Sequence, residues 1–186
     1  MLKQEKKTEE LRKELEQAGI DFSKWGIGET KTLKHLQREI ASKESVLVKD
    51  TRGNLLRKVV IVDAAIYHIK DDGKKYSLVE KKQVFADGRE RQRDHGYSVA
   101  EKAFVGEDPL TAIIRGIREE LGIRGSINPV QIWEVERKLF PKSYPGLLTH
   151  YVGYGFEVFL NKKQFNPNGY VEEQDDKSTY FVWEEV

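Results

Sequence analysis

The chain has 186 residues, a formal net charge of +1 at pH 7 and no cysteine. This length suits one domain with a hydrophobic core and a small appendage. Acidic and basic residues nearly cancel and are mixed along the chain, so the composition does not favour a dedicated nucleic-acid-binding protein. The lack of cysteine excludes disulfides, a thiol nucleophile and a cysteine-based zinc site.

We expect neither a secretory signal nor a membrane span in this sequence. The first residues, MLKQEKKTEELRKELEQ, are too polar for a secretory signal, and no apolar run reaches membrane-spanning length. We therefore expect a cytoplasmic protein that does not engage a membrane.

Residues 1–44 are predicted to form a helical extension. The segment 3–18 carries Leu11, Leu15 and Ala18 at helical spacing and ends near Gly19. A second helix follows, capped by Thr30 or Thr32, with an apolar face made of Leu33, Leu36 and Ile40. Three roles stay open for this extension: it covers a sheet edge, pairs subunits or closes over a substrate as a lid.

From Ser45 the pattern changes to strands separated by turns. Turn signals such as Asp50-Thr51-Arg52-Gly53-Asn54 and Asp72-Gly73 divide the chain into apolar runs. Strands are predicted at 46–48, 55–70, 76–85, 97–104, 130–139, 148–160 and 179–183. One helix lies among them, which favours an α/β sandwich with a mixed sheet over a doubly wound parallel sheet. The predicted organisation is a helical extension over 1–44 and an α/β domain over 45–186.

The single helix of this domain is predicted from Asp108 or Pro109 to Leu121, with Gly122 ending it. Apolar residues recur along it at helical spacing and define a buried stripe. The stripe consists of Leu110, Ile113, Ile114, Ile117 and Leu121.

The same helix carries grouped carboxylates near its end. Glu119 and Glu120 are adjacent, and Glu107 lies just before the helix begins. Arg115 stands four residues before Glu119 and can pair with it, which would hold the rotamer of that glutamate. Hard oxygen ligands grouped in this way suit Mg²⁺ or Mn²⁺. An ordinary solvated surface helix is the alternative for such charges.

The segment from Glu101 to Ile123 resembles the Nudix box, whose pattern is Gly, five residues, Glu, seven residues, then Arg-Glu-(apolar)-x-Glu-Glu-x-Gly-(apolar). The matching positions are Glu107, Arg115, Ile117, Glu119, Glu120, Gly122 and Ile123. The resemblance implies a Nudix-like α/β/α sandwich with a mixed sheet. It also implies Mg²⁺ or Mn²⁺ as cofactor, held by Glu119 and Glu120.

Two positions depart from the family pattern. Glu101 stands where the family has the opening glycine, and we include it among the predicted metal ligands with Glu119 and Glu120. Gly116 stands where the family has a metal-binding glutamate. Glycine inside a helix costs roughly 1 kcal/mol relative to alanine, so the presence of Gly116 inside this helix requires an explanation. Close approach of another segment, room for a metal or water, and decay into a non-catalytic domain are the three explanations.

Further site residues are predicted outside the box. Arg89, Arg91 and Arg93 alternate along an expected extended segment, and they either clamp a diphosphate or solvate a hairpin edge. Glu172 and Glu173, expected in a late loop, are candidates for a catalytic base because Nudix enzymes often draw one from such a loop. Arg115 and Glu107 are assigned to supporting the site.

The resemblance implies a divalent-metal-dependent hydrolase of a nucleoside diphosphate linked to another moiety, of the nucleotide-sugar or ADP-ribose type. A Nudix-fold module that binds nucleotide or protein without turnover is the alternative. A structural protein with a fortuitous acidic helix is a third reading. A nucleotide-type small molecule is therefore the expected partner, and a homodimer is the expected assembly.

Overall fold

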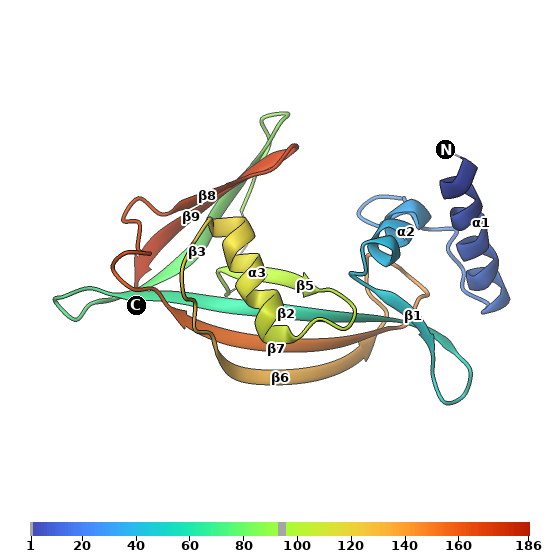
Figure 1. Ribbon diagram of the computed structural model, residues 1–186. Coiled ribbons are helices and arrows are strands. Elements are labelled where there is room, and N and C mark those ends of the chain that lie inside the picture. The colour runs from blue at the N-terminus through green and yellow to red at the C-terminus, as the bar shows by residue number, and fades with distance from the viewer. Residues whose placement is uncertain (1, 93–95) are drawn as a thin grey trace. The chain divides into compact units, whose positions relative to one another are not determined.

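The computed structural model describes residues 2–92 and 96–186 of the chain. Its elements follow in the order drawn in Figure 1. The helices are α1 (Leu2–Gln17), α2 (Leu33–Ala41) and α3 (Pro109–Leu121). The strands are β1 (Val46–Lys49), β2 (Leu55–Ile69), β3 (Lys75–Phe85), β4 (Glu90–Arg91), β5 (Val99–Ala103), β6 (Val130–Leu139), β7 (Thr149–Phe159), β8 (Tyr170–Glu173) and β9 (Lys177–Glu185).

The strands form an open sheet in the order β6-β7-β2-β3-β9-β8, with β1 and β5 pairing with β2 and β4 pairing with β3. The long apolar strand β2 is central, as its sequence predicted, because both of its faces are largely buried. The α/β fold class predicted from the sequence is confirmed. No helix in the described part of the chain is both long and apolar enough to cross a membrane.

The chain divides into two compact units. Unit 1 consists of Met1–Val60, Lys102–Gly106 and Val135–Val152. Unit 2 consists of Ile61–Glu101, Glu107–Glu134 and Gly153–Val186. The predicted division into an extension over 1–44 and a domain over 45–186 remains a prediction.

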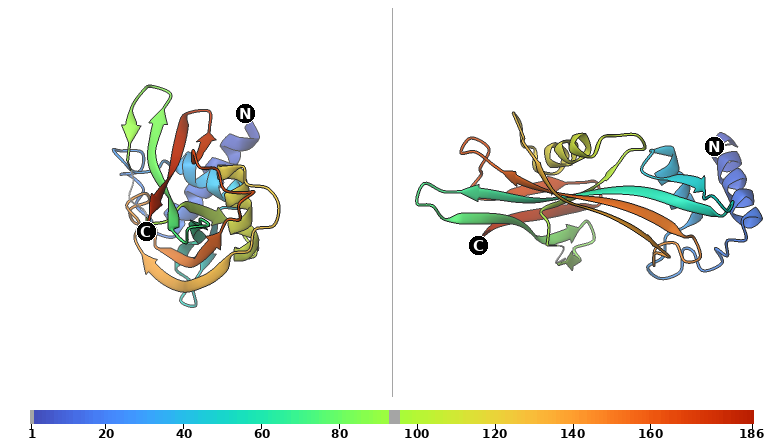
Figure 2. Two further views of the ribbon diagram at one scale, coloured as in Figure 1. Left: turned by 90° about the vertical axis from the view of Figure 1, so that its left-hand side faces the viewer. Right: turned by 90° about the horizontal axis from the view of Figure 1, so that it is seen from below.

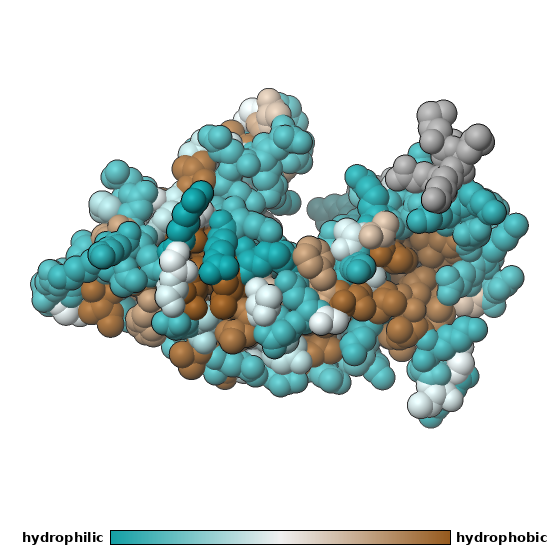
Figure 3. Space-filling view, in the orientation of Figure 1, coloured by the Kyte–Doolittle hydropathy of each residue, from teal (hydrophilic) through white to brown (hydrophobic). Residues whose placement is uncertain are grey.

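Unit 1 has a hydrophobic core of its own, built where the first two helices meet β1 and β2. Its buried members are Leu11, Leu15, Leu33, Leu36, Leu55, Tyr144 and Leu147. In Figure 3, hydrophobic residues gather where α1 and α2 pack above β1. The leucines of the two helices recur at helical spacing, so each helix presents one apolar stripe to this core.

The start of α2 is fixed by a reciprocal cap. The Thr32 side chain accepts a hydrogen bond from the His35 backbone N–H, while the His35 ring accepts one from the Thr32 backbone N–H. Two backbone donors that a helix start leaves without partners are satisfied in this way. Of the two caps predicted for this helix, Thr32 is the one used.

In unit 2, α3 lies on one face of the sheet (Figure 2). Asp108 caps its start by accepting a hydrogen bond from the Thr111 backbone N–H at 2.9 Å, and Pro109 occupies the first turn. Gly122 ends the helix in the left-handed conformation, with φ of 65°. These boundaries confirm the prediction from the sequence.

Two predictions for unit 2 are wrong. Leu110, assigned to the buried stripe of α3, is 43% exposed, because it lies in the first turn, while Ala112 and Gly116 are buried instead. Residues 170–173 form the strand β8 and not a loop. Gly169 enables this pairing, since a Cβ atom there would lie 2.0 Å from the Phe181 backbone oxygen on β9.

Candidate functional site

A cavity of about 320 Å³ in unit 2 gathers five glutamates from four elements. They are Glu80 of β3, Glu101 of β5, Glu119 and Glu120 of α3, and Glu172 of β8. Lys177 is the one basic residue among the described residues that line this cavity. The cavity therefore carries an excess of negative charge, which suits a cation more than an anion.

Glu120 shows the consequence of this crowding. Burial raises the pKa of Glu120, and the negative charges of Glu172, Glu101 and Glu80 raise it further, to about 8. Lys177 opposes the shift without cancelling it. The carboxyl group thus holds a proton near neutral pH unless another positive charge replaces that proton.

Arg115 connects the carboxylates on the helix side of the cavity. It donates two hydrogen bonds to the Glu107 carboxylate, at 3.1 and 3.0 Å, and one to Glu119 at 3.2 Å. The Glu101 carboxylate lies 3.9 Å from the same guanidinium. The predicted pairing of Arg115 with Glu119 is confirmed, and the bidentate bond to Glu107 fixes the guanidinium in place.

The reason for Gly116 is visible at the contact between α3 and β5. A Cβ atom added at Gly116 would lie 3.0 Å from the Cβ atom and 3.2 Å from the Cγ atom of Glu101, and 3.4 Å from a Val99 methyl group. Gly116 and Glu101 are therefore neighbours at this contact. The side chain of Glu101 fills the space that a side chain at position 116 would need, which is the close approach offered as the first explanation.

The two late glutamates are separated by the alternation of β8. Glu172 lines the cavity, while Glu173 is exposed and is not among its lining residues. Successive side chains of a strand point to opposite faces, so only one of the two faces α3. A catalytic role for either residue remains a prediction.

The predicted phosphate-binding arginines lie at different places. Arg91 donates two hydrogen bonds to the side-chain oxygen of Gln83, at 3.2 and 2.6 Å, and Gln83 lines the cavity. Arg89 pairs with Asp87 at 2.7 Å in the turn before β4. Arg93 lies outside the described residues.

Sequence reasoning missed Glu80, Gln83 and Lys177. Gln83 follows Glu80 by three positions, an odd offset, so regular alternation would place the two side chains on opposite faces of β3. A register shift between Glu80 and Lys82 in the pairing of β3 with β9 changes this alternation. The sequence offered one signal for Glu80. It stands two residues after Leu78, so its carboxylate lies on the same core-facing side of the strand.

The donors in the cavity fit a hard divalent cation by their chemistry, since carboxylate oxygens dominate and Glu120 would exchange its proton for a metal. Within residues 2–92 and 96–186, no group of three acidic or histidine side chains is arranged to hold an ion.

No family model and no curated protein matches the chain. Among solved structures, the Ap4A hydrolase of C. elegans is similar at 18% identity and a TM-score of 0.35, with 68% of this chain and 80% of the other covered. The NUDIX domain of Shewanella oneidensis NrtR, solved with ADP ribose, has 10% identity and a TM-score of 0.40, with 78% and 80% covered. DR0079 from Deinococcus radiodurans has 18% identity and a TM-score of 0.35, with 75% and 82% covered. These values describe a distant similarity in chain path.

Proposed function

We propose that the protein is a Nudix-type, divalent-metal-dependent hydrolase of a nucleoside diphosphate linked to another moiety, of the nucleotide-sugar or ADP-ribose type. The observation that carries the proposal is the convergence of five glutamates on one cavity, with Glu120 partly buried among them. The Nudix-box spacing from Glu107 to Ile123 supplies the link to phosphoanhydride chemistry.

Glu101, Glu119 and Glu120 would hold Mg²⁺ or Mn²⁺. Such an ion would neutralise charge on the diphosphate and lower the pKa of a water molecule. Glu101 supplies from β5 the carboxylate that α3 lacks at Gly116, because the Glu101 side chain occupies that space. The site then has three carboxylates without a glutamate at position 116.

The remaining residues position the substrate and move the proton. Glu172 lines the same cavity and would accept the proton of the attacking water on a carboxylate oxygen. Glu173 stays a second candidate for that base. Arg115, fixed by Glu107, holds the carboxylate of Glu119. Arg89, Arg91 and Arg93 are assigned to the phosphates. Attack of water on one phosphorus breaks the phosphoanhydride bond and yields a mononucleotide and a phosphorylated moiety.

The test combines calorimetric titration with Mn²⁺ and a hydrolysis assay on nucleoside diphosphate derivatives. We expect wild-type protein to bind Mn²⁺ and release mononucleotide. Glu120→Gln should lower both metal affinity and rate by roughly 100-fold or more, the size seen when a key electrostatic group is lost. The matched control is Glu184→Gln, an exposed glutamate of β9 paired with Lys81. Equal rates for Glu120→Gln and Glu184→Gln would refute the assignment.

The second candidate function is a nucleotide-binding module without turnover. The helix lacks a carboxylate at Gly116, and Glu120 retains a proton near neutral pH, which favours this reading if no metal binds. If the protein binds nucleotide but neither binds Mn²⁺ nor hydrolyses the nucleotide, it is a binding module and not an enzyme. Cytoplasmic location and homodimer formation remain predictions, which fractionation of cells and sedimentation of the purified protein would check.

A further inference from the structure

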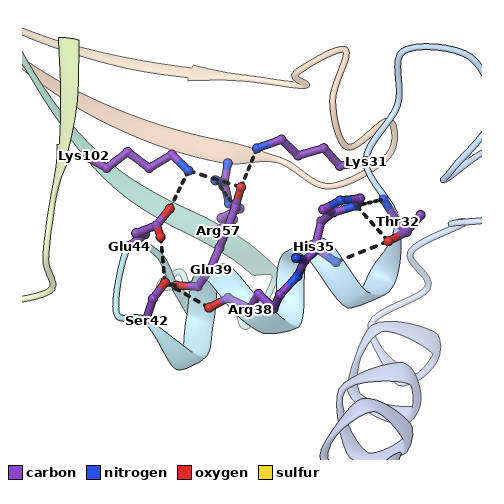
Figure 4. Close-up of polar contacts among 9 residues, drawn as sticks. All are labelled: Lys31, Thr32, His35, Arg38, Glu39, Ser42, Glu44, Arg57 and Lys102. Carbon is purple, nitrogen blue, oxygen red and sulfur yellow. Dashed lines mark hydrogen bonds and ion pairs between the residues drawn. The ribbon is translucent and has the colours of Figure 1, made fainter. Parts of the chain in front are cut away.

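A second cavity, of about 530 Å³, belongs to unit 1 and shares no lining residue with the acidic cavity of unit 2. Its charged and titratable lining consists of Lys31, His35, Arg38, Glu39, Glu44 and Lys102. These residues come from α2, from the segments on either side of it, and from β5 (Figure 4). It is a depression that is largely open to solvent, so a ligand bound there would keep part of its surface exposed.

Glu39 is the centre of this cluster and is saturated with positive partners. Its carboxylate is 2.6 Å from the Lys31 ammonium and 2.6 Å from the guanidinium of Arg57, which is only 3% exposed. Lys102 approaches it at 3.2 Å and also lies 2.8 Å from Glu44. Figure 4 shows Glu39 between these three cations.

The positive charges of the cluster exceed the negative ones. Lys31, Arg57 and Lys102 are the partners of Glu39 and Glu44, and Arg38 is a further cation on the cavity wall. Four positive side chains against two negative ones leave an excess of two. The Arg38 side chain is exposed and has no hydrogen bond or ion pair with the described part of the chain.

His35 adds a donor whose position follows from its cap. The Thr32 backbone N–H donates to His35 Nδ1 at 3.0 Å, so Nδ1 carries no proton in the neutral ring. The proton then resides on Nε2, which leaves an N–H donor on a ring that lines the cavity. Arg38 lies one turn further along α2, so both side chains project from the same side of that helix.

We infer that this cavity binds the phosphate group of a small molecule. A phosphate dianion matches the excess of two positive charges, and the planar guanidinium of Arg38 suits phosphate oxygens through paired N–H donors. The Arg57–Glu39 pair beneath holds the cluster in place. A carboxylate ligand brings one negative charge and gains less from the same field.

The test is calorimetric titration of the full chain with inorganic phosphate in metal-free buffer of low ionic strength, where charge interactions are least screened. Sulfate and acetate are titrated as comparison anions. We expect saturable binding of phosphate with one site per chain, and weaker binding of acetate. No saturable heat with phosphate, or acetate binding as tightly as phosphate, would overturn the inference.

Three variants test whether phosphate binds at this cavity. Arg38→Gln should weaken phosphate binding about tenfold, the usual effect of losing a charge-assisted hydrogen bond. Lys34→Gln, on the same helix and exposed but outside the cavity lining, should leave it within about twofold as a matched loss of charge. Glu44→Gln should tighten binding, because it removes a negative charge beside Lys102. If Arg38→Gln and Lys34→Gln weaken phosphate binding equally, the phosphate is attracted by the general positive charge of the helix and does not occupy a specific site.

This binding is independent of the proposed hydrolase. Glu120→Gln should retain phosphate affinity while it loses metal binding. Loss of phosphate binding in Glu120→Gln but not in Arg38→Gln would place the anion in unit 2 and defeat the inference.

Discussion

Glu39 in unit 1 and Glu120 in unit 2 are both withdrawn from water, yet their pKa values are shifted in opposite directions. Burial disfavours the charged form of both carboxylates. Lys31, Arg57 and Lys102 overcome burial and lower the pKa of Glu39 to about 2. Around Glu120 the neighbours are themselves glutamates, so its pKa rises to about 8. The charge of the neighbours, and not burial alone, decides which carboxyl group is ionised and which holds a proton near neutral pH.

The largest expected effect comes from breaking the paired cluster of unit 1. Glu39→Gln leaves the buried Arg57 guanidinium without its counter-charge, so the free energy of unfolding should fall by about 3–5 kcal/mol. Urea denaturation of the variant measures this loss. Glu9→Gln, which removes an exposed pair with Arg12, should cost less than about 1 kcal/mol. A loss below about 1 kcal/mol for Glu39→Gln would contradict the role of the pair.

The second prediction concerns Glu120 of unit 2 and the effect of its ionisation on stability at different pH values. The folded-state pKa of Glu120, about 8, lies above its ordinary value of 4.5, so its proton stabilises the folded state. This contribution is complete below about pH 4.5 and is lost as pH rises towards about 8. Between these limits, wild-type protein should lose about 2–4 kcal/mol of unfolding free energy relative to Glu120→Gln.

Urea denaturation of both proteins at several pH values measures that difference. Mg²⁺ should reduce it, because a bound cation replaces the proton. Parallel stability profiles for the two proteins would show that Glu120 titrates as it does in water.

The third prediction tests the contact between Gly116 of α3 and Glu101 of β5. Gly116→Glu forces its Cβ atom against Glu101, which should cost about 1–3 kcal/mol of unfolding free energy and outweigh the roughly 1 kcal/mol gained by replacing a helical glycine. Adding Glu101→Gly should recover most of that loss, since it removes the atoms that clash. The four proteins form a double-mutant cycle read by urea denaturation. Additive losses would mean that the two positions do not share one space.

The smallest expected effect concerns the start of the acidic helix. Asp108→Ala removes the acceptor for the Thr111 N–H and should cost about 1 kcal/mol. Asp108→Asn keeps an acceptor and should cost only a few tenths of that free energy. Thermal unfolding of the two variants therefore distinguishes the effect of the capping hydrogen bond from the effect of the negative charge. A similar cost for both would assign the effect to the charge near the helix start.

The sequence by itself determined the local features of this protein. Asp108, Pro109 and Gly122 fix the ends of α3 because capping and the left-handed turn depend on neighbouring residues. The spacing of Arg115 and Glu119 likewise determines their pairing, since four residues make about one helical turn. The apolar run of β2 predicted its central place for a similar reason, as both faces must be buried.

Only the tertiary structure decided which distant side chains meet. The register shift in β3 brings Glu80 and Gln83 to one cavity, and no sequence pattern indicates such a shift. The pairing of Glu39 with Arg57 and Lys102 joins residues that are far apart along the chain. Local patterns specify backbone conformation, but charge and burial at each glutamate depend on neighbours that the packing of strands and helices supplies.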